Sequence, residues 1–298
     1  MTQVNVILGG TSDEREISLR SGAAVAAALQ SVGHQVRSLD SAKASIDEIC
    51  DAEVVFFVLH GKGGEDGTLQ AELEKRATPF VGTGSEASAL CFDKQRYRDF
   101  VAGKLPIPEG ALVSHEEFAA HPLAQRPYVL KPFDGGSSVD TFIIRDVTTA
   151  PTEAISVAFA KHGRLLLEQL IQGPELTVGV LGEDCIGIIE IIPPADGEFD
   201  YENKYNGATQ ELIPPQNISE EVQTQARSLA ETAHRITGCR DFSRTDMMLD
   251  ETTGKLYVLE TNTIPGMTDQ SLFPKMAAYA GLAMPELCDK LVQMALSR

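Results

Sequence analysis

The sequence lacks an apolar run approaching the roughly 20 residues that a membrane-spanning helix needs. Its first ten residues, MTQVNVILGG, have neither the basic segment nor the cleavage site of a signal peptide, so we expect a strand there. Clustered positive charge is also missing, with 25 Lys and Arg against 43 Asp and Glu and a net charge of −18. We therefore expect no nucleic acid and no membrane as partners. ATP remains compatible with this charge, because a few local lysines and a metal ion can outweigh the global field.

Several common functional motifs are absent as well. The five cysteines form no C-x-x-C pair and lie in or beside apolar stretches, which argues against a zinc site or a disulfide framework. Reduced thiols in a cytoplasmic protein are the simpler interpretation. No G-x-x-x-x-G-K-[ST] phosphate loop and no G-x-S-x-G nucleophile elbow occurs. The segment 82–87 matches a dinucleotide fingerprint, G-x-G-x-x-A, but it comes late in its unit and no strand-ending acid follows about 20 residues later.

The first part of the chain alternates strand and helix patterns. Val4–Leu8, Gln35–Leu39 and the continuously apolar Val54–Leu59 are predicted strands, which indicates an open α/β unit with a parallel sheet. Ligands of such sheets lie at the carboxyl ends of the strands, where the polar, glycine-containing loops 9–14 and 60–67 follow. One face of the intervening helix is predicted to be apolar, with Ile17, Val25, Ala28, Leu29 and Val32.

The rest of the chain has the pattern of an α+β fold. We predict strands at Tyr128–Lys131, Phe142–Arg145, Leu165–Leu170, Leu176–Leu181, Cys185–Ile191, Phe242–Leu249 and Leu256–Glu260, and helices at Thr152–Lys161 and Glu221–Ile236. Pro106–Pro108 has the composition of a connector at a boundary. The polar segment between Pro193 and Pro215 has little periodicity, and loops of this length inside a domain are often functional lids or disordered.

A candidate metal site lies near the C-terminus. Two predicted strands joined by a turn at 250–254 form a hairpin. Arg244 and Asp246 point to one face of the first strand, and Glu260 and Asn262 point to one face of the second. Carboxylate and amide oxygens suit Mg²⁺, which binds a few carboxylates together with substrate phosphates. The alternative is a solvated network of ion pairs; it is less favoured because the second strand is strongly apolar and its polar end needs partners.

Other polar residues are weaker candidates. Lys131 ends an apolar strand and precedes the loop Asp134–Ser138, where a lysine and backbone N–H groups can cradle phosphates. Lys94 begins a helix after Asp93 and could equally be a surface lysine. His60 ends a strand before glycines and could be a ligand or a structural histidine.

Eight segments in order resemble the ATP-grasp superfamily and, within it, the D-alanine–D-alanine ligase family. They are GGTSDEREISLRSG at 9–22, LHGKGGEDGTLQ at 59–70, DK at 93–94, LKPFDGGSSV at 130–139, LLEQLIQGPELTVGVLG at 166–182, FDYENKY at 199–205, SRTDMMLD at 243–250 and LETNTIPGMTDQSLFP at 259–274. The resemblance covers almost the whole chain. It implies an N-terminal open parallel-sheet (pre-ATP-grasp) domain at 1–91, followed by a two-lobed ATP-grasp fold with a central lobe at 92–171 and a C-terminal lobe at 172–298.

The resemblance implies an ADP-forming carboxylate–amine ligase. ATP would phosphorylate one D-alanine, and the amine of a second D-alanine would displace the phosphate to give a dipeptide for peptidoglycan synthesis. Two Mg²⁺ ions, or Mn²⁺, would be held by Asp246, Glu260 and Asn262, and Arg244 would stabilise the transferring phosphoryl group. The implied nucleotide contacts are Lys94, Lys131, Ser138, Glu168, Gln169, Ile171 and Glu175.

The same resemblance implies the substrate contacts. Glu14 would bind the ammonium of the first D-alanine in a set with Ser137 and Tyr205. Ser271 and the backbone near Gly266 and Leu272 would receive the carboxylate of the second, and His60 remains a candidate substrate contact. The family is usually a homodimer through its N-terminal domain.

The sequence departs from the family at Asp140, where glycine is usual, at Gln169 and at Thr245. A carboxylate at 140 would repel phosphates unless it points elsewhere. Alternatives therefore stay open: a ligase with D-lactate or D-serine as acceptor, a nucleotide sensor without turnover, or a dinucleotide-binding protein.

Overall fold

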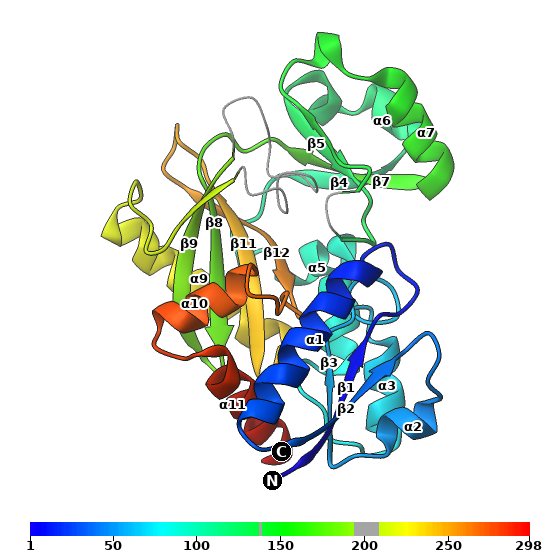
Figure 1. The fold of residues 1–298 in the computed structure, drawn as a ribbon. Coiled ribbons are helices and arrows are strands. Elements are labelled where there is room, and N and C mark those ends of the chain that lie inside the picture. The colour runs from blue at the N-terminus through cyan, green and yellow to red at the C-terminus, as the bar shows by residue number, and fades with distance from the viewer. Residues whose placement is uncertain (137–138, 194–208) are drawn as a thin grey trace.

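The computed structural model describes residues 1–136, 139–193 and 209–298. Within them the chain forms a three-stranded, a four-stranded and a five-stranded sheet, each covered by helices (Figure 1). The first sheet is parallel and the other two are antiparallel. The predicted class, an α/β unit followed by α+β lobes, is confirmed. Among the described residues, no helix has both the length and the apolar character to cross a membrane.

The N-terminal sheet has the order β2-β1-β3. Its strands are β1 (Gln3–Leu8), β2 (Gln35–Asp40) and β3 (Val54–Phe57), and every residue of β3 is buried, as its continuous apolar run predicts. Helix α1 (Arg15–Ser31) packs on one face, and α2 (Ile46–Cys50) and α3 (Thr68–Lys75) pack on the other. The predicted apolar stripe of α1 is wrong at Val32. That residue is 44% exposed because α1 ends at Ser31.

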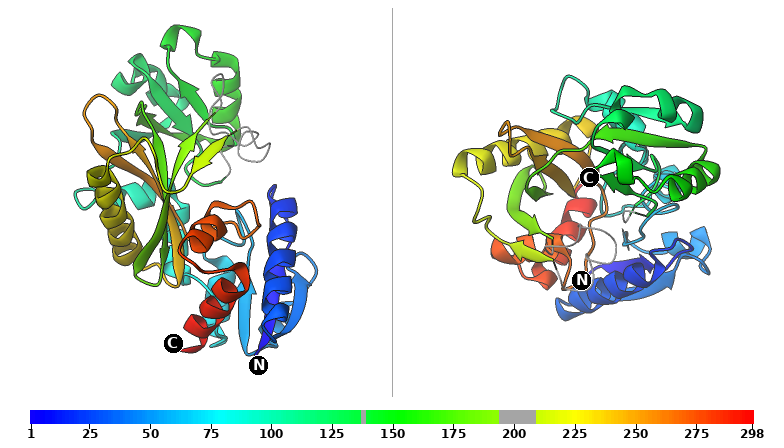
Figure 2. Two further views of the ribbon diagram at one scale, coloured as in Figure 1. Left: turned by 60° about the vertical axis from the view of Figure 1, so that its left-hand side comes forward. Right: turned by 90° about the horizontal axis from the view of Figure 1, so that it is seen from above.

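The four-stranded sheet has the order β4-β7-β5-β6 and forms a separate lobe (Figure 2). Its elements are β4 (Gly110–Ser114), α6 (His115–Ala120), β5 (Tyr128–Lys131), β6 (Phe142–Ile144), α7 (Thr152–His162), β7 (Arg164–Gln169) and two short 3₁₀ turns, Pro122–Gln125 and Val147–Thr149. Phe118, Tyr128 and Phe159 pack in its core. β4 and α6 were not predicted, although Ser114 and Glu117 form a capping box that marks the start of α6.

The five-stranded sheet has the order β10-β9-β8-β11-β12. Its strands are β8 (Glu175–Leu181), β9 (Asp184–Ile192), β10 (Gln210–Leu212), β11 (Phe242–Leu249) and β12 (Leu256–Asn262). One face packs against α9 (Glu220–Thr237), α4 (Ser85–Phe92) and α5 (Lys94–Val101), and the other against α10 (Leu272–Tyr279). α5 therefore contributes Tyr97 and Val101 to the core under this sheet rather than to that of the four-stranded sheet.

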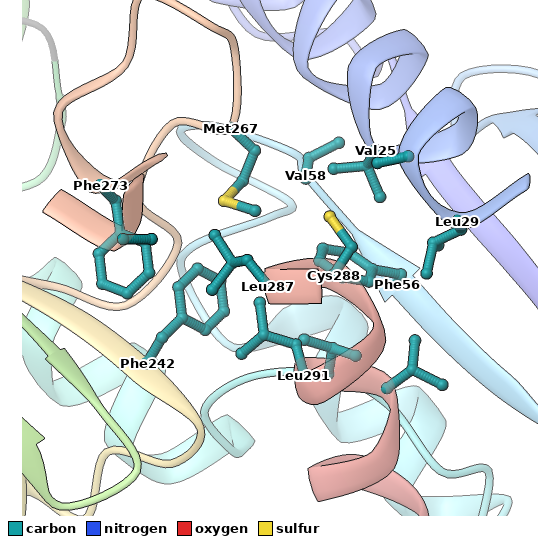
Figure 3. Close-up of a cluster of buried hydrophobic side chains, with 14 of the residues drawn as sticks. Val25, Leu29, Phe56, Val58, Phe242, Met267, Phe273, Leu287, Cys288 and Leu291 are labelled. Carbon is teal, nitrogen blue, oxygen red and sulfur yellow. The ribbon is translucent and has the colours of Figure 1, made fainter. Parts of the chain in front are cut away.

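A hydrophobic core joins the N-terminal unit to the last sheet (Figure 3). Val25 and Leu29 of α1 and Phe56 of β3 meet Leu287 and Leu291 of the C-terminal helix α11 (Met284–Leu296), with Phe242 and Phe273 beyond them. All of these side chains are buried, and each contributes on the order of 2 kcal/mol of hydrophobic stabilisation. The C-terminal helix thus completes the N-terminal core, while the expected domain boundaries at 91 and 171 stay predictions.

The central lobe is connected to the last sheet by two segments that hold the β11–β12 hairpin. The predicted connector at Pro106–Pro108 leads to β4, and the Pro106 carbonyl accepts from the Val258 amide at 2.8 Å. On the return, the Pro174 carbonyl accepts from the Leu249 amide at 2.9 Å. Gly173 has φ +144°, and a Cβ there would lie 2.1 Å from the Leu249 carbonyl oxygen, so only glycine fits this approach.

Candidate active site

Two adjoining cavities, of about 1100 and 830 Å³, lie between the lobes. Glu14, Lys94 and Glu260 line both cavities, together with Phe92 and the backbone of Gly135 and Gly136. Every predicted site residue that the structure describes lines one cavity or the other. The larger is lined by Lys131, Glu168, Gln169, Ile171, Glu175 and Asp246, and the smaller by His60, Arg244, Asn262, Gly266, Ser271 and Leu272. The predicted contacts Ser137, Ser138 and Tyr205 lie outside the described residues.

The predicted hairpin is confirmed, and its register explains the cluster of polar side chains. Asp246 is opposite Glu260, and Arg244 is opposite Asn262, so all four side chains are on one face. The Arg244 guanidinium donates from Nε to Asp246 Oδ1 at 2.9 Å and from Nη2 to Oδ2 at 2.7 Å. This two-pronged geometry fixes both side chains.

The opposite face of the hairpin is buried. The hydroxyl oxygens of Thr245 and Thr261 lie 3.2 Å apart, and that of Thr261 lies 2.8 Å from the Tyr97 hydroxyl. Thr245, a departure from the family pattern, therefore takes part in a satisfied buried network instead of leaving a polar group without a partner. This network holds the hairpin against α5.

The carboxylates on the polar face are balanced by cations. Arg244 pairs with Asp246, and Lys94 Nζ lies 3.4 Å from Glu260 Oε2. Among the described residues, no group of three or more His, Cys, Asp or Glu side chains gathers into a metal site. Two carboxylates and the Asn262 amide oxygen, which accepts from the Ile264 amide at 2.8 Å, are an incomplete ligand set. Such a set fits Mg²⁺ when substrate phosphates supply further oxygens.

Lys94 is positioned by the start of α5. Asp93 caps the helix, since its carboxylate accepts from the amides of Gln95 and Arg96, both at 3.0 Å. The Lys94 amide donates to Phe133 O at 2.7 Å, and its ammonium donates to Gly135 O at 2.6 Å. Lys94 therefore joins the loop at 134–136 to the carboxylates of the hairpin.

Glu14 lies where the loops meet. A Cβ on Gly61 would be 3.3 Å, and one on Gly136 3.1 Å, from Glu14 Oε2, so the carboxylate approaches both backbones closely. Lys62 forms an ion pair with Asp134 at 2.8 Å and joins the same two loops. The loops that the sequence places at the carboxyl ends of β1 and β3 thus meet the loop that follows β5.

His60 and Glu65 form the inner wall of the smaller cavity. Burial, together with the nearby Arg244 charge, lowers the pKa of His60 to about 4, so its imidazole is neutral at neutral pH. Burial and the carboxylate of Glu14 raise the pKa of Glu65 to about 8, although Glu65 accepts from the Gly61 amide at 2.7 Å. Glu65 was not predicted, and the signal that could have found it is its place in the loop after β3.

The inner end of the larger cavity contains a buried carboxylate between two cations. Glu168 is 3% exposed; its Oε2 lies 2.6 Å from Lys131 Nζ and its Oε1 lies 2.5 Å from Arg98 Nη1. Lys131 is thus held by Glu168 at the cavity wall. Arg98 had no predicted role, because nothing in the sequence indicates that α5 and β7 meet.

Asp140 turns toward α7. Its φ of 55° is in the left-handed region, which aspartate tolerates better than most residues. The carboxylate bonds to Lys161 Nζ at 2.7 Å and to His162 Nε2 at 2.8 Å, and these hydrogen bonds lower its pKa. The negative charge that replaces the usual glycine is therefore paired with Lys161 and hydrogen-bonded to His162 at the end of α7.

The smaller cavity ends at the start of α10. The Ser271 hydroxyl accepts from the Thr268 amide at 3.1 Å and lies 2.8 Å from the Thr268 hydroxyl. A Cβ on Gly266 would be 2.7 Å from Ser271 Oγ, so a glycine is needed for this arrangement. Ser271, Gly266 and Leu272 are together, as predicted.

Comparison with known proteins relates the chain to one family. Two family profiles match, described as D-ala D-ala ligase C-terminus over residues 111–293 and D-ala D-ala ligase N-terminus over residues 30–83. The chain is 42% identical over 297 residues to the D-alanine–D-alanine ligase of Xanthobacter autotrophicus, covering 97% of each chain. It is 40% identical to that of Gluconobacter oxydans, covering 99% of this chain and 100% of the relative.

Solved structures are similar over the full length. A D-alanine–D-alanine ligase from Bacillus anthracis matches with a TM-score of 0.85 and 29% identity, covering 100% of this chain and 98% of the other. The same enzyme complexed with ATP matches with a TM-score of 0.84, 25% identity and the same coverage. On its sequence and its fold, the chain belongs to the D-alanine–D-alanine ligase family.

Proposed function

We propose that the protein ligates two D-alanine molecules to D-alanyl-D-alanine, with ATP cleaved to ADP and phosphate, for peptidoglycan precursor synthesis in the cytoplasm. The observation that carries this proposal is the pair Asp246 and Glu260 at the junction of two cavities, one with a lysine-lined wall and one with Glu14 and Arg244. Phosphoryl transfer depends mainly on positioning and charge neutralisation, and both are available at this junction.

In this proposal the larger cavity takes ATP. Of the residues that line it, Glu168, Gln169, Ile171 and Glu175 would contact the nucleoside, and Lys94 and Lys131 would contact the phosphates. The donor set of Asp246, Glu260 and Asn262 would hold two Mg²⁺ or Mn²⁺ ions, which neutralise phosphate charge when bound. The ATP complex of the Bacillus anthracis enzyme, similar over its whole length, supports a nucleotide here. Ser138 stays a predicted phosphate contact.

The smaller cavity would take the two D-alanines. Glu14 would bind the ammonium of the first D-alanine. A carboxylate oxygen of that D-alanine would attack the γ-phosphorus of ATP, which releases ADP and forms an acyl phosphate. The amine of the second would then attack the acyl carbon, and phosphate would leave. Arg244 would stabilise negative charge in both steps. His60, Ser271, Gly266 and Leu272 would surround the second substrate, and Ser137 and Tyr205 stay predicted members of the Glu14 set.

A phosphate-release assay tests the proposal. We expect release only when ATP, Mg²⁺ and D-alanine are all present. Robust turnover with L-alanine and none with D-alanine would overturn it. Mass spectrometry of the product formed with D-alanine, D-lactate and D-serine in competition separates the dipeptide ligase from one that uses another acceptor. The family's usual homodimer, which we propose for this chain, is tested by light scattering.

A further inference from the structure

Arg98 is buried behind the wall of the larger cavity and does not line it. Its side chain, on α5, is 7% exposed, and Nη1 lies 2.5 Å from Glu168 Oε1. Its Nη2 donates to the Pro108 carbonyl oxygen at 2.8 Å. A guanidinium holds its charge at any ordinary pH and presents several donors in a fixed plane, so these two contacts fix its orientation.

The backbone is shaped to admit Arg98. β4 begins at Gly110, which pairs with Glu168 in the sheet. A Cβ on Gly110 would lie 2.8 Å from Arg98 Nη2 and 2.8 Å from the Leu167 carbonyl oxygen. A larger residue at 110 would therefore push the guanidinium away from Glu168. The contact between Arg98 of α5 and Glu168 of the four-stranded sheet therefore depends on the backbone around it and not on the ion pair alone.

Glu168 connects Arg98 to the cavity. One carboxylate oxygen, Oε1, pairs with Arg98, and the other, Oε2, lies 2.6 Å from Lys131 Nζ. Glu168 and Lys131 both line the cavity, whereas Arg98 lies on the far side of the carboxylate. Without the guanidinium, the whole charge of a buried carboxylate would be balanced by Lys131 alone, which would bind it more tightly and in a less defined position.

We propose that Arg98 is a positioning residue for nucleotide binding. By taking one oxygen of Glu168, it leaves Lys131 positive enough to bind a nucleotide phosphate and holds the carboxylate in a defined orientation toward the nucleoside. The inference rests on the proposed function, since it requires ATP in the larger cavity. Lys94 lies one turn before Arg98, so α5 carries both the cation next to Glu260 and the cation behind Glu168.

Steady-state kinetics of Arg98→Met and Arg98→Lys test this role. Loss of a charge-assisted hydrogen bond at Glu168 is expected to raise the KM for ATP about tenfold in Arg98→Met. The KM values for D-alanine should stay within about twofold, because Arg98 reaches no part of the smaller cavity. Arg98→Lys keeps the charge and should recover part of the loss. Arg96→Met, an exposed arginine on the same helix, is the matched control and should behave as wild type.

A double variant separates positioning from general stability. If Arg98 acts through Glu168, the effects of Arg98→Met and Glu168→Gln on the KM for ATP will not add. Additive effects, or equal rises in the KM values for ATP and D-alanine, would overturn the inference. If Arg98→Met does not fold, Arg98→Lys tests the inference by the same comparison, the rise in the KM for ATP against the rise in the KM for D-alanine. A wild-type protein without D-alanine-dependent phosphate release would instead refute the proposed function.

Discussion

Asp246 and Glu260 are direct partners across the β11–β12 hairpin, and each has its own cation, Arg244 on the first and Lys94 on the second. Two carboxylates on one face would repel each other without these partners. The arrangement therefore holds two negative groups side by side at the junction of the cavities. Mg²⁺ would bring positive charge and the ATP phosphates would bring negative charge. Binding both together therefore need not leave either carboxylate without a balancing cation.

Neutral substitutions at this pair should abolish turnover. We expect Asp246→Asn and Glu260→Gln each to lower kcat/KM for ATP by about a hundredfold or more, because the charge that holds Mg²⁺ is removed. The measurement is D-alanine-dependent phosphate release over a range of Mg²⁺ concentrations. The control is Glu251→Gln, an exposed carboxylate in the turn of the same hairpin, which should leave activity unchanged. Full activity in both variants would show that the pair does not hold the metal, and would leave only the ion-pair network.

Removing the charge of Asp140 should have little effect on nucleotide use. The carboxylate is already paired with Lys161 and hydrogen-bonded to His162, and asparagine tolerates the same left-handed φ. We expect the KM for ATP of Asp140→Asn to change by less than about fivefold, since a solvent-accessible ion pair contributes up to about 1 kcal/mol. A tenfold fall in this KM would mean that the aspartate repels phosphates. Absence of turnover in the wild type, with ATP binding retained, would favour the nucleotide sensor.

Buried His234 should make a contribution to the stability of the fold that is lost in mild acid. Burial lowers the pKa of this side chain to about 4, and its Nδ1 lies 2.7 Å from Ser243 Oγ. The unfolded chain takes up a proton near pH 6.5, whereas the folded one does so only near 4, so stability falls as pH decreases between these values. One such histidine contributes up to about 3 kcal/mol to that loss.

Urea unfolding of wild type and His234→Asn between pH 4 and 7 measures this effect. Asparagine keeps a polar group near the position of Nδ1 but does not ionise. The variant should be less stable at pH 7, where it loses packing, and should lose less stability than wild type on acidification. Parallel pH profiles for the two proteins would show that His234 does not carry the dependence. His60, also with a pKa near 4, should add to the slope that remains, and Glu65, whose pKa is raised to about 8, should oppose it.

Local patterns predicted much of the fold. The strands β1, β5, β8, β9 and β11 fall within two residues of their predicted bounds, because each is a short apolar run that ends at polar or turn residues. β4 was missed because Gly110–Ser114 is short and begins with glycine. The stripe of α1 failed at Val32 because the helix ends one residue earlier, and helix boundaries are set by caps and not by hydrophobic period alone.

The site could be predicted from the sequence only in part. Spacing alone put Asp246 and Glu260 on strands of one hairpin, and the register confirms the face they share. Arg98 could not be found in that way, because it meets Glu168, which is 70 residues away in the sequence. The sequence places Glu65 in the loop after β3, but its raised pKa depends on burial and on Glu14, which come together only in the fold. The orientation of Asp140 likewise depends on α7 and its terminal Lys161 and His162.

In the proposed reaction, D-alanine is activated as an acyl phosphate. This activation is tested most directly with D-alanine that carries ¹⁸O at both oxygens of its carboxylate, by mass spectrometry of the phosphate released. The carboxylate oxygen that attacks ATP becomes the bridging oxygen of the acyl phosphate. When the amine of the second D-alanine attacks the acyl carbon, the carbon–oxygen bond breaks and this oxygen leaves with the phosphate. We expect phosphate with one ¹⁸O atom for each D-alanyl-D-alanine formed. Unlabelled phosphate released in step with dipeptide would contradict the acyl-phosphate route.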